Sequence, residues 1–208
     1  MRRTTRYAAK TLKGLEKVLA KELRDLGADQ VTEGRRVVFF EGNKEVLYRA
    51  NLNVRTAINI LKPIEHFRFR SENDLYEQFK KIVWGKHQDV EQTFAIRASV
   101  FSEAFNHTKF PALKLKDTLA DWFRDKYGRR PSVDLESPNI GYDLHISKDR
   151  ATISMDSSGS LLNRRGYRID GGQAPLNEVL AAGLIALSGW NKEEPFHNPM
   201  CGSGTLAI

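Results

Sequence analysis

The residues whose types and spacing are best suited to binding a ligand form one octet near the C-terminal end of the chain, Asn198-Pro199-Met200-Cys201-Gly202-Ser203-Gly204-Thr205. Its two glycines allow positive φ angles and leave main-chain N–H groups open to a ligand, because no Cβ stands in the way. At the start of a helix, such N–H groups favour anionic or polar ligands. Residues 193–197 could form a strand and the residues after Thr205 suit a helix start. We therefore expect strand, glycine turn and helix in that order.

The glycine spacing alone allows another interpretation. Gly202-x-Gly204-x-x-Ala207 also fits the dinucleotide-binding fingerprint, which is a weak signal when it is this short. A nucleotide-dependent dehydrogenase is therefore one alternative, and its acidic residue would be expected about 20 residues after the loop, past Ile208. That alternative leaves Pro199 and Cys201 without a role.

The whole octet resembles the first motif of class I S-adenosylmethionine-dependent RNA methyltransferases that carry a THUMP domain, usually Asp-Pro-x-Cys-Gly-Ser-Gly-Thr. The segment Ala174–Ala182 resembles the one that precedes this motif in the family. The resemblance implies S-adenosylmethionine as the cofactor. The cofactor-binding residues that it implies are Asn198, Pro199, Cys201, Gly202, Ser203, Gly204, Thr205 and Pro175. Asn198 departs from the family's Asp, so its amide would receive the methionyl group without the charge assistance that strengthens a hydrogen bond.

Composition limits the class of protein. The chain has 208 residues, 40% hydrophobic and 28% charged, which is ordinary for a soluble protein of one or two domains. No apolar run approaches the ~20 residues that cross a bilayer, and no signal-peptide pattern is present, so we expect a cytoplasmic protein without membrane association. A single cysteine excludes an internal disulfide, and the five scattered histidines show no metal-ligand spacing.

The positive charge is concentrated at the N-terminal end. Residues 1–70 carry 16 Lys and Arg against 8 Asp and Glu, whereas residues 71–158 carry 13 against 14, and the net charge of the chain is +7. A basic module ahead of a ligand loop points to an anionic partner, and nucleic acid is favoured over a membrane surface. A merely soluble basic surface explains the charge equally well.

The first 70 residues predict a ferredoxin-like domain. Leu15, Leu19 and Leu23 share one face of an amphipathic helix that Gly27 ends, and Asn43 can cap a second helix. The expected order is strand, helix, strand, strand, helix, strand. The expected elements cover residues 5–10, 12–26, 30–33, 37–41, 43–51 and 56–69.

Residues 71–160 predict a second domain. Ser71 and Asp74 form a capping-box-like start to a helix that runs to Trp84, and the longest helix, residues 109–127, ends at Gly128. Four extended segments are expected, at residues 93–101, 132–135, 140–147 and 151–156. This domain resembles a THUMP domain, an RNA-binding module of RNA-modifying enzymes. The matching stretches are residues 93–98, 114–117 and 161–168.

The resemblance implies a basic RNA-binding set, Lys114, Lys116, Arg129, Arg130, Arg164, Arg165 and Arg168. Such side chains hold phosphates without reading sequence, and Tyr167 among the last three could stack on a base. Taken alone, the two lysines fit an ordinary solvated helix face. Arg165 and Arg168 could equally be structural arms that connect domains.

From residue 161 onward we expect a linker and the beginning of a Rossmann-like α/β methyltransferase domain. A helix from Pro175 should carry an apolar stripe of Leu176, Val179, Leu180, Leu184 and Leu187. The expected fold class is thus α+β, a ferredoxin-like domain and a THUMP domain followed by the start of an α/β domain.

The resemblance covers the whole chain and is strongest to large-subunit ribosomal RNA guanine-N(2) methyltransferases. It implies methyl transfer to RNA, most often rRNA and alternatively tRNA. The family's catalytic motif, Asn/Asp-Pro-Pro-Tyr/Phe, does not occur in the 208 residues, so no catalytic residue is assigned and the chain alone should be inactive. A stand-alone RNA-binding module is the other alternative. The sequence leaves open the modified nucleotide, guanine N2 or adenine N6, and the oligomeric state.

Overall fold

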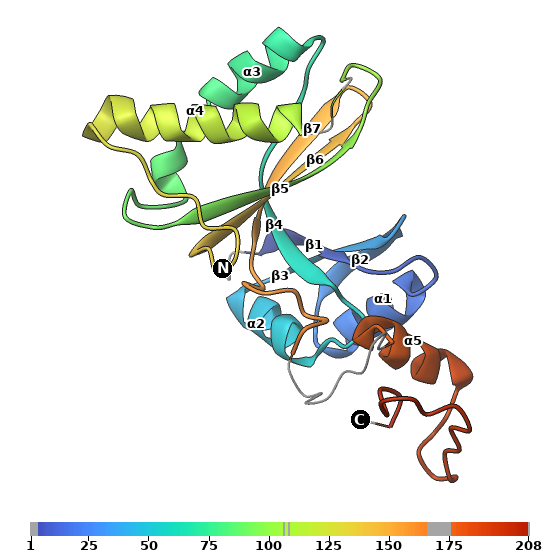
Figure 1. Ribbon diagram of the computed structural model, residues 1–208. Coiled ribbons are helices and arrows are strands. Elements are labelled where there is room, and N and C mark those ends of the chain that lie inside the picture. The colour runs from blue at the N-terminus through green and yellow to red at the C-terminus, as the bar shows by residue number, and fades with distance from the viewer. Residues whose placement is uncertain (1–3, 106, 108, 166–175, 208) are drawn as a thin grey trace. The chain divides into compact units, whose positions relative to one another are not determined.

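A computed structural model gives the structure of the protein (Figure 1). The described residues are 4–105, 107, 109–165 and 176–207. They form two compact units, which are described here one at a time. The first comprises Met1–Ile60 and Ser160–Ile208, and the second comprises Leu61–Gly159. In the described part of the chain, no helix is both long enough and apolar enough to cross a membrane.

The first unit alternates strands and helices as predicted. Its elements are β1 (Thr5–Lys10), α1 (Glu16–Asp25), β2 (Asp29–Gly34), β3 (Val37–Gly42), α2 (Lys44–Asn53), the start of β4 (Asn59–Arg68) and, after the second unit, α5 (Glu178–Ser188). The Asn43 side chain caps α2 by accepting a hydrogen bond from the Val46 N–H at 3.0 Å. Helix α1 begins four residues later than the sequence predicted, because Gly14 takes a φ of +93° and turns the chain before Glu16.

The strand order of the first unit confirms the ferredoxin-like prediction. Strand β3 pairs antiparallel with both β1 and β2, and β4 follows on the other side of β1, giving the order β2-β3-β1-β4. The two inner strands are therefore β1 and β3. Leu19 and Leu23 of α1 are fully buried in one cluster with Phe40 and Ile60, so the predicted apolar stripe of α1 is its core face.

The second unit places three helical segments between its strands. Its elements are the rest of β4, α3 (Glu72–Lys80), the 3₁₀ helix η1 (Trp84–Lys86), β5 (Phe94–Phe101), α4 (Phe110–Tyr127), β6 (Ile140–Ser147) and β7 (Arg150–Asp156). The Ser71 hydroxyl accepts the Asp74 N–H at 3.2 Å and caps α3, and Gly128 ends α4 with a φ of +71°.

The sheet of this unit has the order β4-β7-β6-β5. Strands β5 and β6 are parallel, which requires a crossover, and α4 provides it. The β6–β7 and β7–β4 pairs are antiparallel. Helices α3 and α4 cover one face of this sheet (Figure 1).

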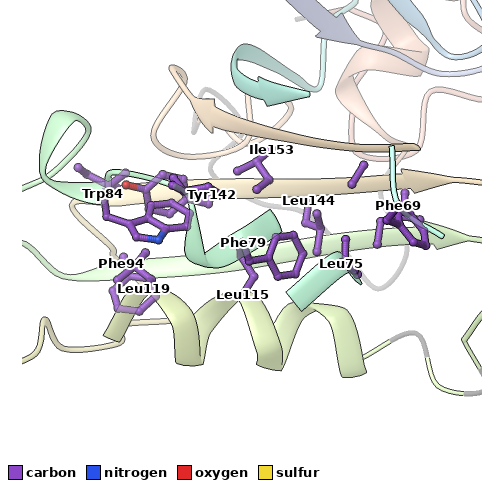
Figure 2. Packing of buried hydrophobic residues seen from close by; sticks show 14 of the residues in the cluster. Phe69, Leu75, Phe79, Trp84, Phe94, Leu115, Leu119, Tyr142, Leu144 and Ile153 are labelled. Carbon is purple, nitrogen blue, oxygen red and sulfur yellow. The ribbon is translucent and has the colours of Figure 1, made fainter. Parts of the chain in front are cut away.

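The core of the second unit lies between that face and the two helices. Figure 2 shows Leu115 and Leu119 of α4 and Phe79 of α3 directed toward the sheet, which contributes Leu144 and Ile153 to the same cluster. All five side chains are excluded from solvent. Fully burying a large apolar side chain contributes about 1.5–3 kcal/mol, so this layer is the main source of stability of the second unit.

Two expected elements of the second unit differ in the structure. Helix α3 ends at Lys80, short of Trp84, because the chain turns there and inserts the Trp84 ring into the core beside Tyr142 (Figure 2), with centroids 5.2 Å apart. Residues 132–135 do not form a strand. Only Val133 makes an isolated parallel bridge, to Phe94.

Helix α5 packs differently from its sequence pattern. Val179 of the predicted stripe is buried, as is Ala181, whereas Leu184 and Leu187 of the same stripe are 47% and 58% exposed. Gly183 decides this packing, because a Cβ there would lie 3.0 Å from Leu15 Cγ and closer still to the two methyl groups of Leu15. The smallest residue of α5, rather than its leucines, thus meets the first unit's core.

Candidate functional site

The second unit contains a cleft of about 600 Å³ between α3, α4 and the segment after α4. The residues that line it are Tyr76, Phe94, Lys116, Asp117, Ala120, Asp121, Arg124, Arg130, Pro131, Ser132 and Val133. Two members of the predicted RNA-binding set line this cleft. Lys116 lies within α4, and Arg130 lies just after its C-terminal end. A cleft with cationic walls and the Tyr76 ring can hold a phosphate and an adjacent ring.

The cleft's charges are partly balanced within its own wall. Lys116 Nζ lies 3.5 Å from Asp117 Oδ1, and Arg124 Nη1 lies 2.9 Å from Asp121 Oδ1. Both basic side chains keep large exposed fractions, 42% and 53%. Exposed pairs of this kind are weak, so each cation stays available to an incoming phosphate.

Lys114, another predicted RNA-binding residue, lies beside the cleft. Its ammonium is 5.3 Å from the Tyr76 ring centroid and 5.5 Å from that of Phe110. Lys80 approaches the same Tyr76 ring at 4.4 Å, and its hydrogen bond to Glu77 raises the pKa of Lys80. Two cations near one ring create a local positive field at the Tyr76 end of the cleft.

The remaining predicted RNA-binding residues are not gathered at this cleft. Arg129 forms an ion pair with Glu91 and does not line the cleft. Arg164 is exposed in the first unit, and Arg168 lies outside the described residues.

Arg165 has a structural position in the first unit. Its guanidinium donates hydrogen bonds to the carbonyl oxygens of Asn51, Leu52 and Val54, at 3.1, 2.7 and 2.6 Å. Its Nε also donates to the Leu162 carbonyl at 3.1 Å. The side chain therefore satisfies carbonyls at the C-terminal end of α2, where a helix leaves acceptors unpaired and favours a cation. These contacts lie within the first unit and involve no residue of the THUMP-like unit.

The glycine loop lies in the first unit. Gly202 and Gly204 have φ angles of +53° and +78°, and no atom lies within 4 Å of a Cβ built on either one. The Gly204 N–H donates to the Cys201 carbonyl at 2.8 Å, which closes a tight turn. The backbone conformation and the open space beside both glycines fit a bound cofactor.

The side chains of the loop are engaged locally. Asn198 Oδ1 accepts the Met200 N–H at 3.3 Å, and the hydroxyls of Ser203 and Thr205 are 3.4 Å apart. Cys201 is exposed and Thr205 is buried. Pro175, the remaining cofactor-binding prediction, lies outside the described residues.

The strand and helix expected around the loop are not formed. Residues 193 and 194 form a bend, residues 195–197 have no regular secondary structure, and residues 206 and 207 lie in a turn. The physical reason is hydrogen bonding: a parallel strand needs a neighbouring strand, and within the described residues none lies beside 193–197. The Trp190 and Phe196 rings, 5.2 Å apart, fold this segment on itself.

Sequence reasoning missed several cleft residues. Tyr76, Asp121 and Arg124 line the cleft but were not selected as candidates. A usable signal was present, because Lys116, Ala120 and Arg124 are spaced four apart and share one stripe of α4. The contribution of Tyr76 required the packing of α3 against α4.

Family comparisons match three successive parts of the chain. Residues 6–61 match the RlmL ferredoxin-like domain, residues 69–156 match the THUMP domain, and residues 165–208 match the RMKL-like methyltransferase domain.

Similar proteins extend over nearly the whole chain. A Synechocystis protein named as an RNA methyltransferase is 42% identical over 99% of this chain and 54% of its own length. The ribosomal RNA large subunit methyltransferase K/L of Syntrophotalea carbinolica is 42% identical over 98% of this chain and 29% of its own length. The chain thus spans about half or less of the length of these relatives.

Solved structures agree with the fold. The protein SMU.472, described as a methyltransferase complexed with SAH, matches with a TM-score of 0.82 and 28% identity over 99% of this chain and 54% of that one. A Listeria monocytogenes protein described as an N6-adenine-specific DNA methylase matches with a TM-score of 0.83 and 28% identity over the same shares. The ferredoxin-like strand order, the THUMP match and the cysteine-glycine loop thus make this chain similar to the corresponding part of THUMP-domain methyltransferases.

Proposed function

We propose that this chain supplies the RNA-binding region and the first cofactor motif of an S-adenosylmethionine-dependent RNA methyltransferase. The observation that carries the proposal is the coincidence of a basic, aromatic-walled cleft in the THUMP unit with relatives named as rRNA methyltransferases along the whole chain. The target is an exocyclic amine of large-subunit rRNA, and guanine N2 is our choice of amine. An rRNA substrate implies a cytoplasmic enzyme.

RNA is held in this proposal by the cations of the second unit. Lys116 and Arg130 contact phosphate oxygens from the cleft, and Lys114 adds charge beside Tyr76. Arg129 of the second unit is a further phosphate contact in this proposal, and Arg164 and Arg168, which lie outside that unit in the sequence, are proposed as separate RNA contacts. Phosphate contacts position RNA without reading bases, so selection of the nucleotide belongs to another part of the enzyme.

S-adenosylmethionine binds the glycine loop in this proposal. The backbone of Gly202 and Gly204 lies against the cofactor, Asn198 receives its methionyl group, and Pro199, Cys201, Ser203 and Thr205 complete the wall with Pro175. When bound, the cofactor supplies the methyl group. The loop's own contribution is an open backbone surface and short polar side chains.

The proposed domain limits are residues 1–70, 71–160 and 161–208. The proposal also assigns no catalytic role to these residues, because holding the target amine requires a polar motif that the chain does not contain.

A salt titration of RNA binding tests the proposal. Affinity of the chain for structured rRNA should fall steeply with salt, and Lys116→Ala and Arg130→Ala should each reduce the slope of log K against log salt by about 0.9. Lys81→Ala removes an exposed lysine directly after α3 that does not line the cleft, so this control should leave affinity and slope nearly unchanged. A slope near zero for the unmodified chain would contradict RNA binding through phosphates.

A further inference from the structure

The second unit's sheet has a face that the helices do not cover. Tyr142, Leu144 and Ile146 of β6 are buried among the helices, so their neighbours in the strand, Asp143, His145 and Ser147, lie on the opposite face. Residues paired across neighbouring strands lie on the same face of a sheet. The strand register therefore identifies the residues of β4, β5 and β7 that share a face with Asp143, His145 and Ser147.

Two adjacent cross-strand rows on this opposite face contain no carboxylate. The first is His66, Thr152, His145 and Ser99, and the second is Arg68, Arg150, Ser147 and Phe101, each taken in the order β4-β7-β6-β5. We call these eight residues the open sheet face. They come from four strands that the sequence separates by up to 86 residues, as the hydrogen bond between His66 Nδ1 and Thr152 Oγ1 at 2.9 Å illustrates.

The open sheet face is exposed and cationic. Phe101 is 68% exposed, the Arg68 side chain is 66% exposed, and His66, His145 and Arg150 are also exposed. Asp149, in the β6–β7 turn, forms a long pair with Arg68, at 3.9 Å. The next row, by contrast, contains Asp143, which is buried.

An exposed aromatic pair accompanies the arginines. The Phe101 and His145 rings lie 5.9 Å apart with an interplanar angle of 55°. A large apolar ring on a polar sheet face loses favourable burial unless a ligand covers it. The flat face of an RNA base can cover such a ring. Base faces are accessible in unpaired strands but are hidden within a duplex.

We propose that the open sheet face binds an unpaired RNA segment, with Arg68 and Arg150 on phosphates and the Phe101 ring stacked on a base. The two rows are separated by two residues along each strand, about 7 Å, so a strand of RNA can place a base and its phosphates on the same face. The serine, threonine and histidine side chains between them offer hydrogen bonds to sugar and base. This inference rests on the proposed function for the nature of the partner, and it adds a second surface that requires unpaired nucleotides.

The test measures binding of the 208-residue chain to a short oligoadenylate and to an RNA duplex of similar length. Phe101→Ala should weaken oligoadenylate binding roughly tenfold and leave duplex binding within about twofold. Phe101→Leu keeps an apolar side chain without a ring and should behave like Phe101→Ala. Arg68→Ala and Arg150→Ala should each reduce the single-strand salt slope by about 0.7.

Matched controls separate this inference from the proposed function. Leu135→Ala removes a side chain that is 77% exposed elsewhere in the unit, and Lys81→Ala removes an exposed charge on the helical layer, so both should bind like the unmodified chain. If the chain binds RNA and only cleft variants weaken it, the inference about the sheet face is wrong while the proposed function stands. If the chain binds no RNA, the proposed function is wrong, and so is the inference that rests on it.

Two other results would overturn the inference. If Phe101→Ala lowers the affinity for oligoadenylate and for the duplex equally, the Phe101 ring does not stack on unpaired bases. A change in the mass of the RNA-free chain in Phe101→Ala, measured by sedimentation, would identify a second copy as the occupant of this face.

Discussion

Arg165 Nη2 donates a hydrogen bond to the Val54 carbonyl oxygen at 2.6 Å, across 111 positions of sequence. This bond is one of three carbonyl contacts that attach the segment after the second unit to the end of α2, and a fourth contact, to the Leu162 carbonyl, lies within that segment. The same contacts place Leu162 on the first unit's core, where its N–H donates to the Ile58 carbonyl at 2.8 Å. Arg165 thus fixes the point from which the chain proceeds toward the glycine loop.

Arg165→Lys should lower the free energy of unfolding by about 2 kcal/mol, because one ammonium cannot reach four carbonyls that a planar guanidinium serves together. Thermal unfolding measures the effect. Arg164→Lys, one position earlier and exposed, is the matched control and should unfold at the original temperature. Equal shifts in the two variants would mean that the contacts to α2 contribute nothing specific.

Gly183→Ala should loosen α5 from the first unit. The new Cβ collides with the buried Leu15 side chain, and overpacking of this kind destabilises by about 1–3 kcal/mol, more than the helix propensity gained from alanine. Hydrogen exchange of the α5 amides should accelerate.

Adding Leu15→Ala to Gly183→Ala should restore part of the α5 protection, because the added methyl then fills space that the leucine vacated. Losses that simply add in the double variant would show that the two residues are not coupled.

Stability of the first unit should fall as the pH drops through the acidic range. Burial opposes ionisation of Glu16, but the N–H groups of Arg36 and Gly14 donate to its carboxylate at 2.9 and 2.7 Å, and the net result is a lowered pKa. A lowered folded-state pKa means that the stabilisation is present above the unfolded value of 4.5 and is lost as pH falls through the folded value.

Chemical denaturation at neutral and acidic pH checks this contribution of Glu16. The stability difference between the unmodified chain and Glu16→Gln should be largest at neutral pH and should shrink on acidification. Glu33→Gln, on an exposed position of β2, is the control and should show little difference at either pH. A Glu16→Gln difference that does not change with pH would exclude the carboxylate charge as its origin.

Asn198→Asp should tighten S-adenosylmethionine binding by about 1 kcal/mol or less in a protein that contains the whole methyltransferase domain. A carboxylate restores charge assistance to the acceptor that faces the methionyl ammonium. Calorimetry provides the measurement, and Asn191→Asp, outside the loop, controls for added charge. Unchanged or weaker binding would show that residue 198 does not face the ammonium.

The 208-residue chain should not methylate RNA by itself. It lacks the polar motif that holds a target amine, and the described residues from 190 to 207 form no strand or helix that could fix a donor at bonding distance. Incubation with labelled donor and unmethylated rRNA tests this expectation, with the enzyme that contains the whole domain as positive control. Turnover above the protein-free background would require a catalytic site within these residues.

The sequence by itself determined the features that depend on neighbouring residues. The Asn43 cap, the Gly128 stop of α4 and the apolar alternation of β6 each act within a few positions, so the elements and the ferredoxin-like order were predictable. The glycine loop was recognisable for the same reason, because its φ angles belong to Gly202 and Gly204 themselves.

Tertiary structure decided what depends on residues far apart in the chain. The strand expected at 193–197 does not form, because strand hydrogen bonds need a neighbour that local sequence does not supply. Lys116 and Arg130 meet Tyr76 only because α3 packs on α4, and Phe101 stands beside His145 only through the β5–β6 register. In the sequence, Arg165 is one of several cations in a basic stretch. Its structural role depends on carbonyl groups more than a hundred residues away, which only the tertiary structure brings close.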